Sequence, residues 1–211
     1  MFKCPYLSYT EIGNRAASFL KQYHPSQDIP IPVEEIIELK LELNIFPFPR
    51  LYKDHGLNGF LSYDLTTIYV DEVQFNQFNE KYRYTLAHEL GHYVLHRVCY
   101  EDLIFQSIED YVNWRMTLPT DEVGWFETQG EWFAGQLLVP SNQLIDICKK
   151  VVAKHEDDFK KLSSIPDDIW SYISIEIADY FDVNPPVVEN RIKKENIPAK
   201  INISSGKRNW G

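Results

Sequence analysis

The sequence predicts an α+β fold in which a small antiparallel sheet packs on helices, followed by a helical C-terminal region. Two helical apolar patterns, around residues 78–96 and 127–140, carry this prediction together with two short strand-like runs that precede the first of them. A hydrophobic content of 44% and an aromatic content of 14% over 211 residues are typical of a globular protein with a substantial core.

The segment before the sheet predicts two helices. Ser8 or Thr10 can cap a helix over residues 8–23, and the prolines that follow it force an extended link. Apolar spacing then predicts an amphipathic helix over 33–43. The run 45–48 is strand-like, and its proline indicates the edge of a sheet.

Phe60–Tyr63 and Thr67–Val70 are rich in β-branched and aromatic residues and flank a turn at Asp64. We expect them to form a hairpin that supports the next helix. An edge strand of this hairpin could align an extended peptide by backbone pairing, or the hairpin could serve only for packing.

The stretch Tyr84–His96 predicts a metal-binding helix. His88 and His92 are one helical turn apart, so their imidazoles can converge on one ion, and Glu89 between them is placed to take a proton from a bound water. Another face of the same helix carries an apolar stripe, which is expected to face the core: Phe78, Tyr82, Leu86, Leu90 and Val94.

The alternative is a pair of inert histidines on an amphipathic helix. His96 continues the spacing but lies too far along the axis to reach the same ion, so we expect it to be a charge near the helix C-terminus. Leu95 and Val98 stand where a longer metalloprotease motif would have Gly and a third His. The third ligand must therefore come from elsewhere in the chain.

Residues 97–126 are expected to form a short helix and a loop, which either covers a cleft or is an ordinary connection. The segment 127–140 is a second helix ending at Pro140. Glu127 lies on the inward side of this helix, one turn before Gly130, and is the candidate third ligand.

The TLAHELGH helix together with the segment from Glu127 to Pro140 resembles the ImmA/IrrE family of zinc metallo-endopeptidases, whose second motif reads ExxANxFAxxLLxP. The resemblance implies a zincin-like peptidase core over residues 1–140 and one zinc ion per chain. It implies that His88, His92 and Glu127 bind the zinc and that Glu89 is catalytic.

Two positions depart from the family pattern: Gly130 replaces the usual Ala and Glu131 the usual Asn. Glu131 could accept a hydrogen bond from a ligand imidazole, could exchange roles with Glu127, which is one turn away, or could be a solvated charge.

Beyond the resemblance, residues 141–197 are expected to form a helical region and 198–211 a tail. A charged stretch over 154–161 precedes a helix opening at 165–167. The segment 175–192 looks like two helices joined by a tight turn, as in helix-turn-helix units.

Charge argues against direct nucleic-acid binding. The chain has 31 acidic and 21 basic residues, a net charge of −10, which repels phosphate backbones. The final helix carries few cations, and these lie near its end: Arg191, Lys193 and Lys194. Packing is therefore the expected role of the helix pair.

Cys4, Cys99 and Cys148 lack paired metal-ligand spacing, so free thiols are expected. No apolar run approaches the length of a membrane span, and the first residues lack a signal peptide's hydrophobic stretch. We therefore expect a cytoplasmic protein without a membrane partner.

The resemblance implies a peptidase that cleaves a specific protein such as a helix-turn-helix transcriptional repressor, and so acts as an antirepressor. One alternative is a metal-dependent DNA-binding transcription regulator without turnover, and another is a metal-stabilised interaction module. The sequence leaves the oligomeric state open. It also leaves open which side chain stabilises the oxyanion, with these candidates: Tyr93, His96, Tyr100, Tyr111 and Arg115.

Overall fold

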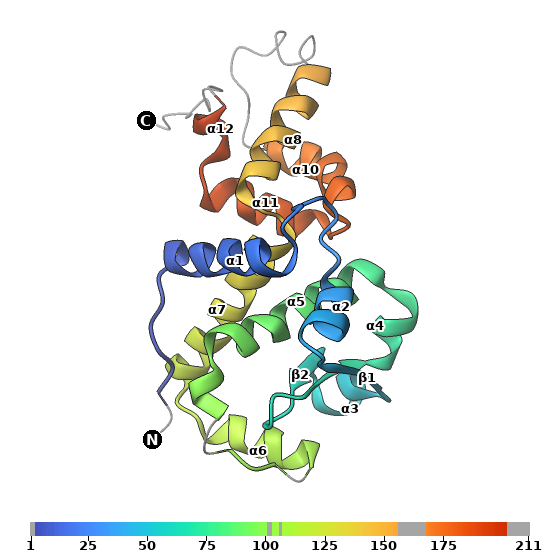
Figure 1. Cartoon of the computed structure of the whole chain (residues 1–211), viewed down its shortest axis with the longest axis vertical. Coiled ribbons are helices and arrows are strands. Elements are labelled where there is room, and N and C mark those ends of the chain that lie inside the picture. Colours follow the sequence, from blue (N-terminus) through green and yellow to red (C-terminus); the bar gives the residue numbers. More distant parts are fainter. Residues whose placement is uncertain (1–2, 101–102, 106, 156–167, 202–211) are drawn as a thin grey trace. The chain divides into compact units, whose positions relative to one another are not determined.

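The computed structural model describes residues 3–100, 103–105, 107–155 and 168–201 (Figure 1). The chain divides after Leu138 into two compact units, residues 1–138 and 139–211. The architecture is α+β, as the sequence predicts, with the strands in the first unit.

The described part of the first unit combines one small sheet with helices. Its elements are α1 (Tyr9–Tyr23), α2 (Val33–Glu35), the π-helix η1 (Ile36–Lys40), β1 (Asn44–Phe48), α3 (Leu51–His55), β2 (Gly59–Leu61), β3 (Thr67–Asp71), α4 (Glu72–Gln77), α5 (Asn79–Leu95), the 3-10 helix η2 (Arg97–Tyr100), α6 (Ile108–Thr117) and α7 (Thr120–Leu138).

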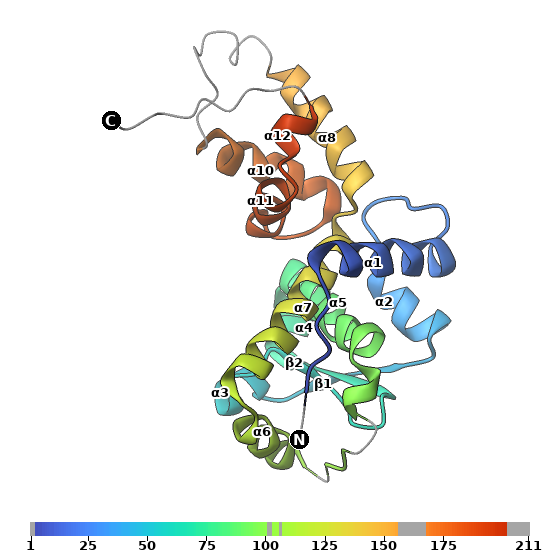
Figure 2. The ribbon, with the colours of Figure 1, turned by 90° about the vertical axis from the view of Figure 1, so that its left-hand side faces the viewer.

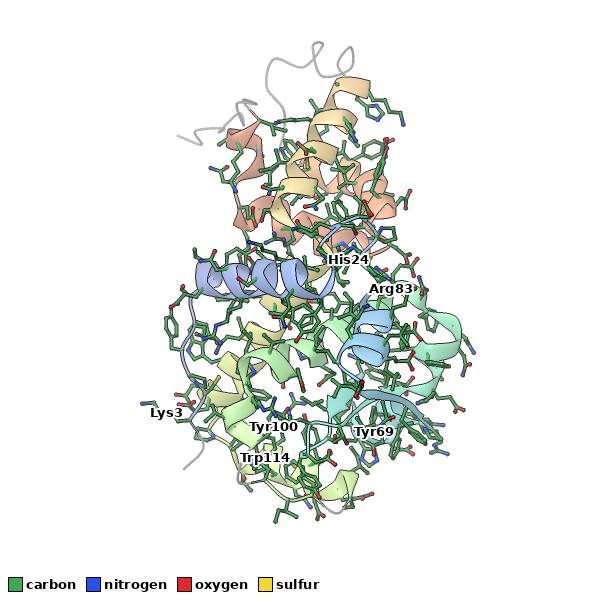
Figure 3. All side chains as sticks on the ribbon, in the orientation of Figure 1. Lys3, His24, Tyr69, Arg83, Tyr100 and Trp114 are labelled. Atoms are coloured by element: carbon green, nitrogen blue, oxygen red, sulfur yellow. The ribbon has the colours of Figure 1, made fainter. Side chains whose placement is uncertain are left out.

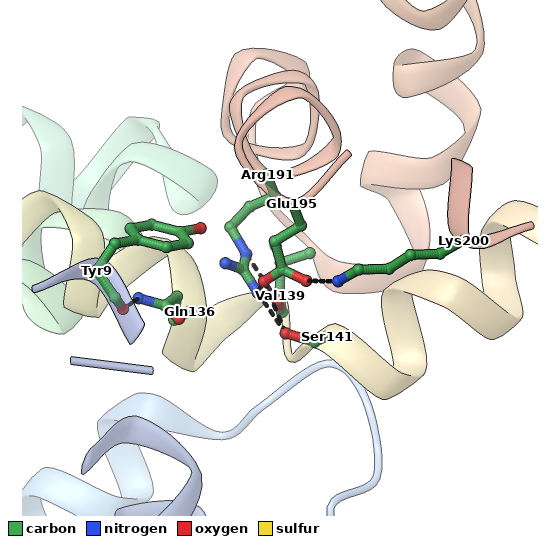
Figure 4. A network of polar contacts seen from close by, with 7 residues as sticks. All are labelled: Tyr9, Gln136, Val139, Ser141, Arg191, Glu195 and Lys200. Atoms are coloured by element: carbon green, nitrogen blue, oxygen red, sulfur yellow. Dashed lines mark hydrogen bonds and ion pairs between the residues drawn. The ribbon is translucent and has the colours of Figure 1, made fainter. Parts of the chain in front are cut away.

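Helix α1 begins where the sequence offers two caps, and Ser8 is the one used. The Ser8 hydroxyl accepts a hydrogen bond from the Glu11 backbone N–H at 3.3 Å, and the Glu11 carboxylate accepts one from the Ser8 N–H at 2.8 Å. The buried face of α1 packs on α7, where the Gln136 side chain donates to the Tyr9 carbonyl at 3.1 Å (Figure 4). This contact joins the start of the first unit to its last helix.

The sheet has the order β1-β3-β2 and is mixed. Strands β2 and β3 form the predicted antiparallel hairpin, but β1 runs parallel to β3, so the prediction of a wholly antiparallel sheet is wrong. The reason is topological: the chain passes from β1 through α3 and β2 before β3 enters the centre of the sheet. Pro47 lies on the edge strand β1, as its missing N–H requires.

Helix α5 packs between α7 and the strands β2 and β3 (Figures 1 and 2). Leu86 and Leu90 are fully buried, as predicted, and Tyr82 is nearly so. The predicted apolar stripe fails at its two ends. Phe78 precedes the helix and is 51% exposed, and Val94 is only half-buried.

Helices α5 and α7 cross at two glycines. A Cβ on Gly91 would lie 3.2 Å from the carbonyl oxygen of Gly130 and 3.3 Å from its Cα, which is tighter than ordinary van der Waals contact. The absence of side chains at this crossing therefore lets the two backbones approach closely. It brings the histidines of α5 against the glutamates of α7.

The segment 97–126 is more helical than predicted. It contains η2, α6 and the first turns of α7, which begins at Thr120 rather than at residue 127. Pro119 separates α6 from α7, but Gly124 lies inside α7 and does not break it. Glu127 consequently sits in the middle of a long helix, where its backbone is held by hydrogen bonds on both sides.

The described part of the second unit is helical: α8 (Ser141–Lys154), α10 (Asp168–Phe181), α11 (Pro185–Lys194) and α12 (Ile197–Lys200). The tight turn between α10 and α11 agrees with the sequence prediction. The predicted helix opening at 165–167, most of the charged stretch 154–161 and residues 202–211 of the expected tail lie outside the described residues.

A buried ion pair links the helices of the second unit. Arg191 is 3% exposed, and its guanidinium lies 2.6 Å from the Glu195 carboxylate and donates to the Val139 carbonyl at 3.1 Å (Figure 4). Glu195 also accepts hydrogen bonds from Ser141 and Lys200. Charge and hydrogen bonds thus satisfy both buried ions.

All three cysteines are free, as predicted, with Cys4 and Cys148 buried and Cys99 half-buried. Among the described residues, none of the helices combines the length and apolar character that crossing a bilayer requires.

Candidate metal centre

Helices α5 and α7 bring together His88, His92 and Glu127. The Nε2 atoms of the two histidines lie 3.0 Å apart, and a carboxylate oxygen of Glu127 lies 3.2 Å from His88 Nε2. One ligand atom from each of the three residues lies within 4.8 Å of the others. Two imidazoles and one carboxylate are a donor set that suits zinc.

A side chain at position 130 would crowd the imidazoles of His88 and His92. A Cβ there would lie 2.9 Å from His88 Cε1 and 3.1 Å from His92 Nε2, too close for real side chains without a shift. The residue at which the sequence departs from the family's usual Ala therefore provides the room in which the two imidazoles lie.

Glu89 is 5% exposed and lines the same cleft as the three potential ligands. Burial is the main cause that raises its pKa, to about 7. The charge of Glu127 acts in the same direction, whereas the charges of His88 and Arg115 and a hydrogen bond from the Leu61 backbone N–H lower the pKa. A carboxyl group of this kind can exchange a proton near neutral pH, which suits general acid–base chemistry.

The carboxylate of Glu127 bridges two partners. Its Oε2 faces His88, while its Oε1 lies 2.7 Å from an Nη2 of Arg115 on α6. Burial would raise the pKa of Glu127, but the hydrogen bond and charge of His88 and the charge of Arg115 outweigh burial and lower it. Glu127 is therefore an ionised carboxylate, the form that binds metal.

The acidic groups also act on His88. Burial would lower the pKa of His88, but its hydrogen bond to Glu127 and the charges of Glu89, Glu127 and Glu131 raise it. The centre is therefore a site of negative potential, which attracts a cation.

His96 is not the charged helix terminus that the sequence predicts. It is fully buried, and burial lowers its pKa to about 4, so the ring is neutral. Its Nδ1 lies 2.9 Å from His92 Nδ1, and its Nε2 lies 3.8 Å from Cys4 Sγ. The ring of Phe126 on α7 stacks on the imidazoles of both His92 and His96. Together with the N-terminal segment it covers the end of α5, which the sequence predicted to be open to solvent.

This contact orients His92. With Nε2 of His92 turned to the metal centre, its Nδ1 carries the proton and donates to His96 Nδ1, which leaves His96 Nε2–H directed to the Cys4 sulfur. Gln129 donates to the same sulfur at 3.1 Å.

The centre opens into a cleft of about 220 Å³. Of the five candidates for oxyanion stabilisation, Tyr111 and Arg115 line this cleft, whereas His96 and Tyr100 are buried outside it and Tyr93 does not line it. Glu131 is exposed at the rim, where its backbone carbonyl lies 3.5 Å from the Tyr84 hydroxyl.

One wall of the cleft, residues 56–59, is not predicted by sequence reasoning. A buried network holds it: the Gln74 side chain donates to Asn58 Oδ1 at 2.7 Å and accepts from the Thr85 hydroxyl at 3.0 Å. Thr85 begins the TLAHELGH motif, one turn before Glu89, and its hydroxyl is buried. A polar residue at this place in the motif was the signal in the sequence that could have pointed to the network.

No curated protein matches the sequence. A protein-family model described as the IrrE N-terminal-like domain, Peptidase_M78, matches residues 76–193, a span that includes both helices of the metal centre. Since this match covers more than half of the 211 residues, the chain belongs to the Peptidase_M78, or ImmA/IrrE, family of metallopeptidases.

Proposed function

We propose that the protein is a zinc-dependent endopeptidase in which His88, His92 and Glu127 hold one zinc ion and Glu89 is the catalytic base. The observation that carries this proposal is the convergence of the three donor atoms within 4.8 Å of one another, beside a buried Glu89 in the same cleft. When bound, zinc would polarise the scissile carbonyl and acidify a water molecule.

Glu89 takes the proton of the attacking water and delivers it to the leaving amine, because it flanks the ligand pair without joining it. Tyr111 and Arg115 are the donors available to the oxyanion. Burial raises the pKa of Tyr111, so its hydroxyl stays protonated and can donate a hydrogen bond. Arg115 places a positive charge beside Glu127 on the same wall of the cleft.

The free edge of β2 aligns the substrate backbone. Asn58 and Ser62 direct their backbone groups to β3, since the Asn58 carbonyl accepts from Asp71 N–H and Ser62 N–H donates to the Thr67 carbonyl. By alternation, Gly59 and Leu61 direct theirs away from β3. The Leu61 N–H is taken by the Glu89 carboxylate, so an extended peptide can pair with the backbone groups of Gly59 and lie across the cleft.

We propose that the substrate is a helix-turn-helix transcriptional repressor, which makes the protein an antirepressor acting in the cytoplasm. Family resemblance supports this substrate class, and so does charge. A net charge of −10 attracts a basic DNA-binding protein and repels DNA itself.

The main alternative, a DNA-binding regulator, gains no support from α11. Arg191 is buried in its ion pair with Glu195, and Lys193 pairs with Glu189. Cations held in this way are poorly placed to contact phosphates.

The test combines metal content with proteolysis. We expect about one zinc per chain in the wild type, loss of zinc in His92→Ala, and retained zinc but no cleavage in Glu89→Gln. Glu131→Ala is the matched control, since Glu131 is an acidic residue of α7 at the rim of the same cleft, and it should keep its zinc. Cleavage by Glu89→Gln at the wild-type rate would overturn the mechanism.

The substrate class has its own test. The protein is titrated against a helix-turn-helix repressor encoded beside it and against promoter DNA at low and moderate salt. We expect binding to the repressor that weakens with salt, followed by cleavage when zinc is present. Salt-sensitive binding to DNA alone, with no repressor cleavage, would favour the regulator.

A further inference from the structure

A second cavity of about 280 Å³ adjoins the cleft in the first unit, and we propose that it receives an aromatic side chain of the polypeptide substrate. This inference rests on the proposed peptidase function and adds a specificity site to it. This space is termed the aromatic cavity, and its lining includes Phe60, Tyr69, Phe105, Ile108 and Tyr111.

One side of the aromatic cavity consists of rings in stacking and edge contacts, and the other of small polar side chains such as Thr67 and Ser107. Phe60 stacks on Tyr69 with centroids 4.6 Å apart and on Tyr111 with centroids 5.1 Å apart, and Phe105 meets Tyr111 edge to face at 5.6 Å. Tyr69 of β3 and Trp114 of α6 mark this part of the unit in Figure 3. Such walls favour a further ring, which can stack or make edge contacts in the same way.

The size of the cavity fits this occupant. An apolar cavity of about 150 Å³ is enough to bind benzene, so the aromatic cavity has room for a phenylalanine or tyrosine side chain. Asp64 lies at the polar side of the cavity. Its Oδ1 accepts hydrogen bonds from the Ser62 hydroxyl and from the Thr66 N–H and hydroxyl, which commit it to the turn between β2 and β3.

The position of the cavity relative to β2 explains how a substrate reaches it. Tyr111 lines both the cleft and the aromatic cavity. Along β2, a Cβ on Gly59 would point at Thr85 and towards Glu89, whereas Phe60 points into the cavity. A peptide paired with the free edge of β2 has side chains that alternate in the same way, so one residue faces the metal centre and its neighbour faces the cavity.

The experiment uses the zinc-loaded full chain and a library of peptides from a digested proteome, with cleaved bonds identified by mass spectrometry. In the wild type we expect an aromatic residue to be enriched roughly tenfold at one fixed position beside the cleaved bond. Ile108→Trp fills the cavity and should abolish this enrichment in favour of small residues. Ile108→Ala, which enlarges the cavity, should keep it and admit tryptophan more readily.

Met116→Trp is the matched control, because Met116 lies on the same helix, is 78% exposed and does not line the cavity. Its cleavage profile should equal that of the wild type. Cleavage without aromatic preference in the wild type, enrichment of basic residues at that position, or an unchanged profile in Ile108→Trp would each overturn the cavity assignment while leaving the peptidase proposal intact.

A binding measurement separates the two proposals if no peptide is cleaved. N-acetyl-phenylalaninamide is titrated into the ¹⁵N-labelled protein, with N-acetyl-glycinamide as the control probe. Shifts at Phe60, Tyr69 and Ile108 with the aromatic probe alone, lost in Ile108→Trp, would support the cavity as an aromatic site even though the peptidase proposal had failed. The absence of shifts there would overturn the inference.

Discussion

Arg115 and Glu127 form an ion pair between α6 and α7, with Nη2 of the arginine 2.7 Å from Oε1 of the glutamate. The second oxygen of the same carboxylate lies 3.2 Å from His88 Nε2. A potential metal ligand is therefore held on its far side by a cation from the segment 97–126, for which the sequence predicted a short helix and a loop of undecided role.

The first prediction concerns this pair. Arg115→Ala should weaken zinc affinity by about tenfold or more, because Glu127 loses the partner that orients it. The affinity is measured by competition with a chromophoric chelator. Arg50→Ala is the control. Arg50 pairs with the Asp54 carboxylate, one turn away, but this arginine is exposed and does not line the cleft. Equal zinc affinity in Arg115→Ala and the wild type would show that the pair does not position the ligand.

The second prediction concerns the helix crossing. Gly130→Ala adds a methyl group 2.9 Å from His88 Cε1, so the imidazoles must shift and zinc affinity should fall. The loss should be less than about tenfold, because the ring ends can move and the family usually has Ala at this position. Gly124→Ala lies on the same helix with nothing within 4 Å of its added Cβ. That variant should bind zinc normally and gain up to about 1 kcal/mol in stability from reduced backbone freedom. Normal zinc binding by Gly130→Ala would mean that the imidazoles tolerate the methyl group.

The third prediction concerns His96. His96→Phe preserves the stacking on Phe126 but removes the acceptor for His92 Nδ1–H, so zinc affinity should fall by about 10–100-fold with the fold retained. His96→Gln, whose amide oxygen can accept the same hydrogen bond, should recover part of the affinity. Circular dichroism checks the fold, and chelator competition measures the affinity. If Phe and Gln behave alike, packing rather than the hydrogen bond explains the burial of His96.

The fourth prediction concerns the second unit. Arg191→Met leaves the Glu195 carboxylate without its guanidinium partner and should lower the free energy of unfolding by about 1–3 kcal/mol, since Ser141 and Lys200 still bond to it. Denaturant unfolding followed by circular dichroism measures this loss. Adding Glu195→Gln to Arg191→Met should recover part of it, because the double variant no longer holds a carboxylate that has lost its guanidinium partner and keeps only Ser141 and Lys200. Equal stability of the single and double variants would contradict this account.

The same pair predicts acid sensitivity. Burial would raise the pKa of Glu195, but the charge of Arg191 and the hydrogen bonds from Ser141 and Lys200 lower it below its ordinary value. The ionised carboxylate therefore adds stability above the unfolded pKa of about 4.3, and that stability is lost as the pH falls through the lower folded pKa. Glu195→Gln should show a flatter decline in melting temperature between about pH 5 and pH 3 than the wild type.

Sequence spacing alone predicted the parts of this protein that depend on local geometry. The i, i+4 separation of His88 and His92 places both rings on one face of any helix, and a helix start was expected at Ser8 or Thr10, of which Ser8 is the cap. The hairpin of β2 and β3 is local in the same sense. The assignment of the chain to its family also followed from two short motifs.

Tertiary structure decided what depends on contacts between distant segments. The parallel pairing of β1, the ion pair of Arg115 with Glu127, and the burial of His96 under Cys4 all join residues that no period in the sequence relates. His96 shows the physical reason most clearly. Its position after the last turn of α5 suggests solvent and charge, but burial in the packed chain removes the water that would stabilise the charge, and the ring becomes a neutral hydrogen-bond partner of His92.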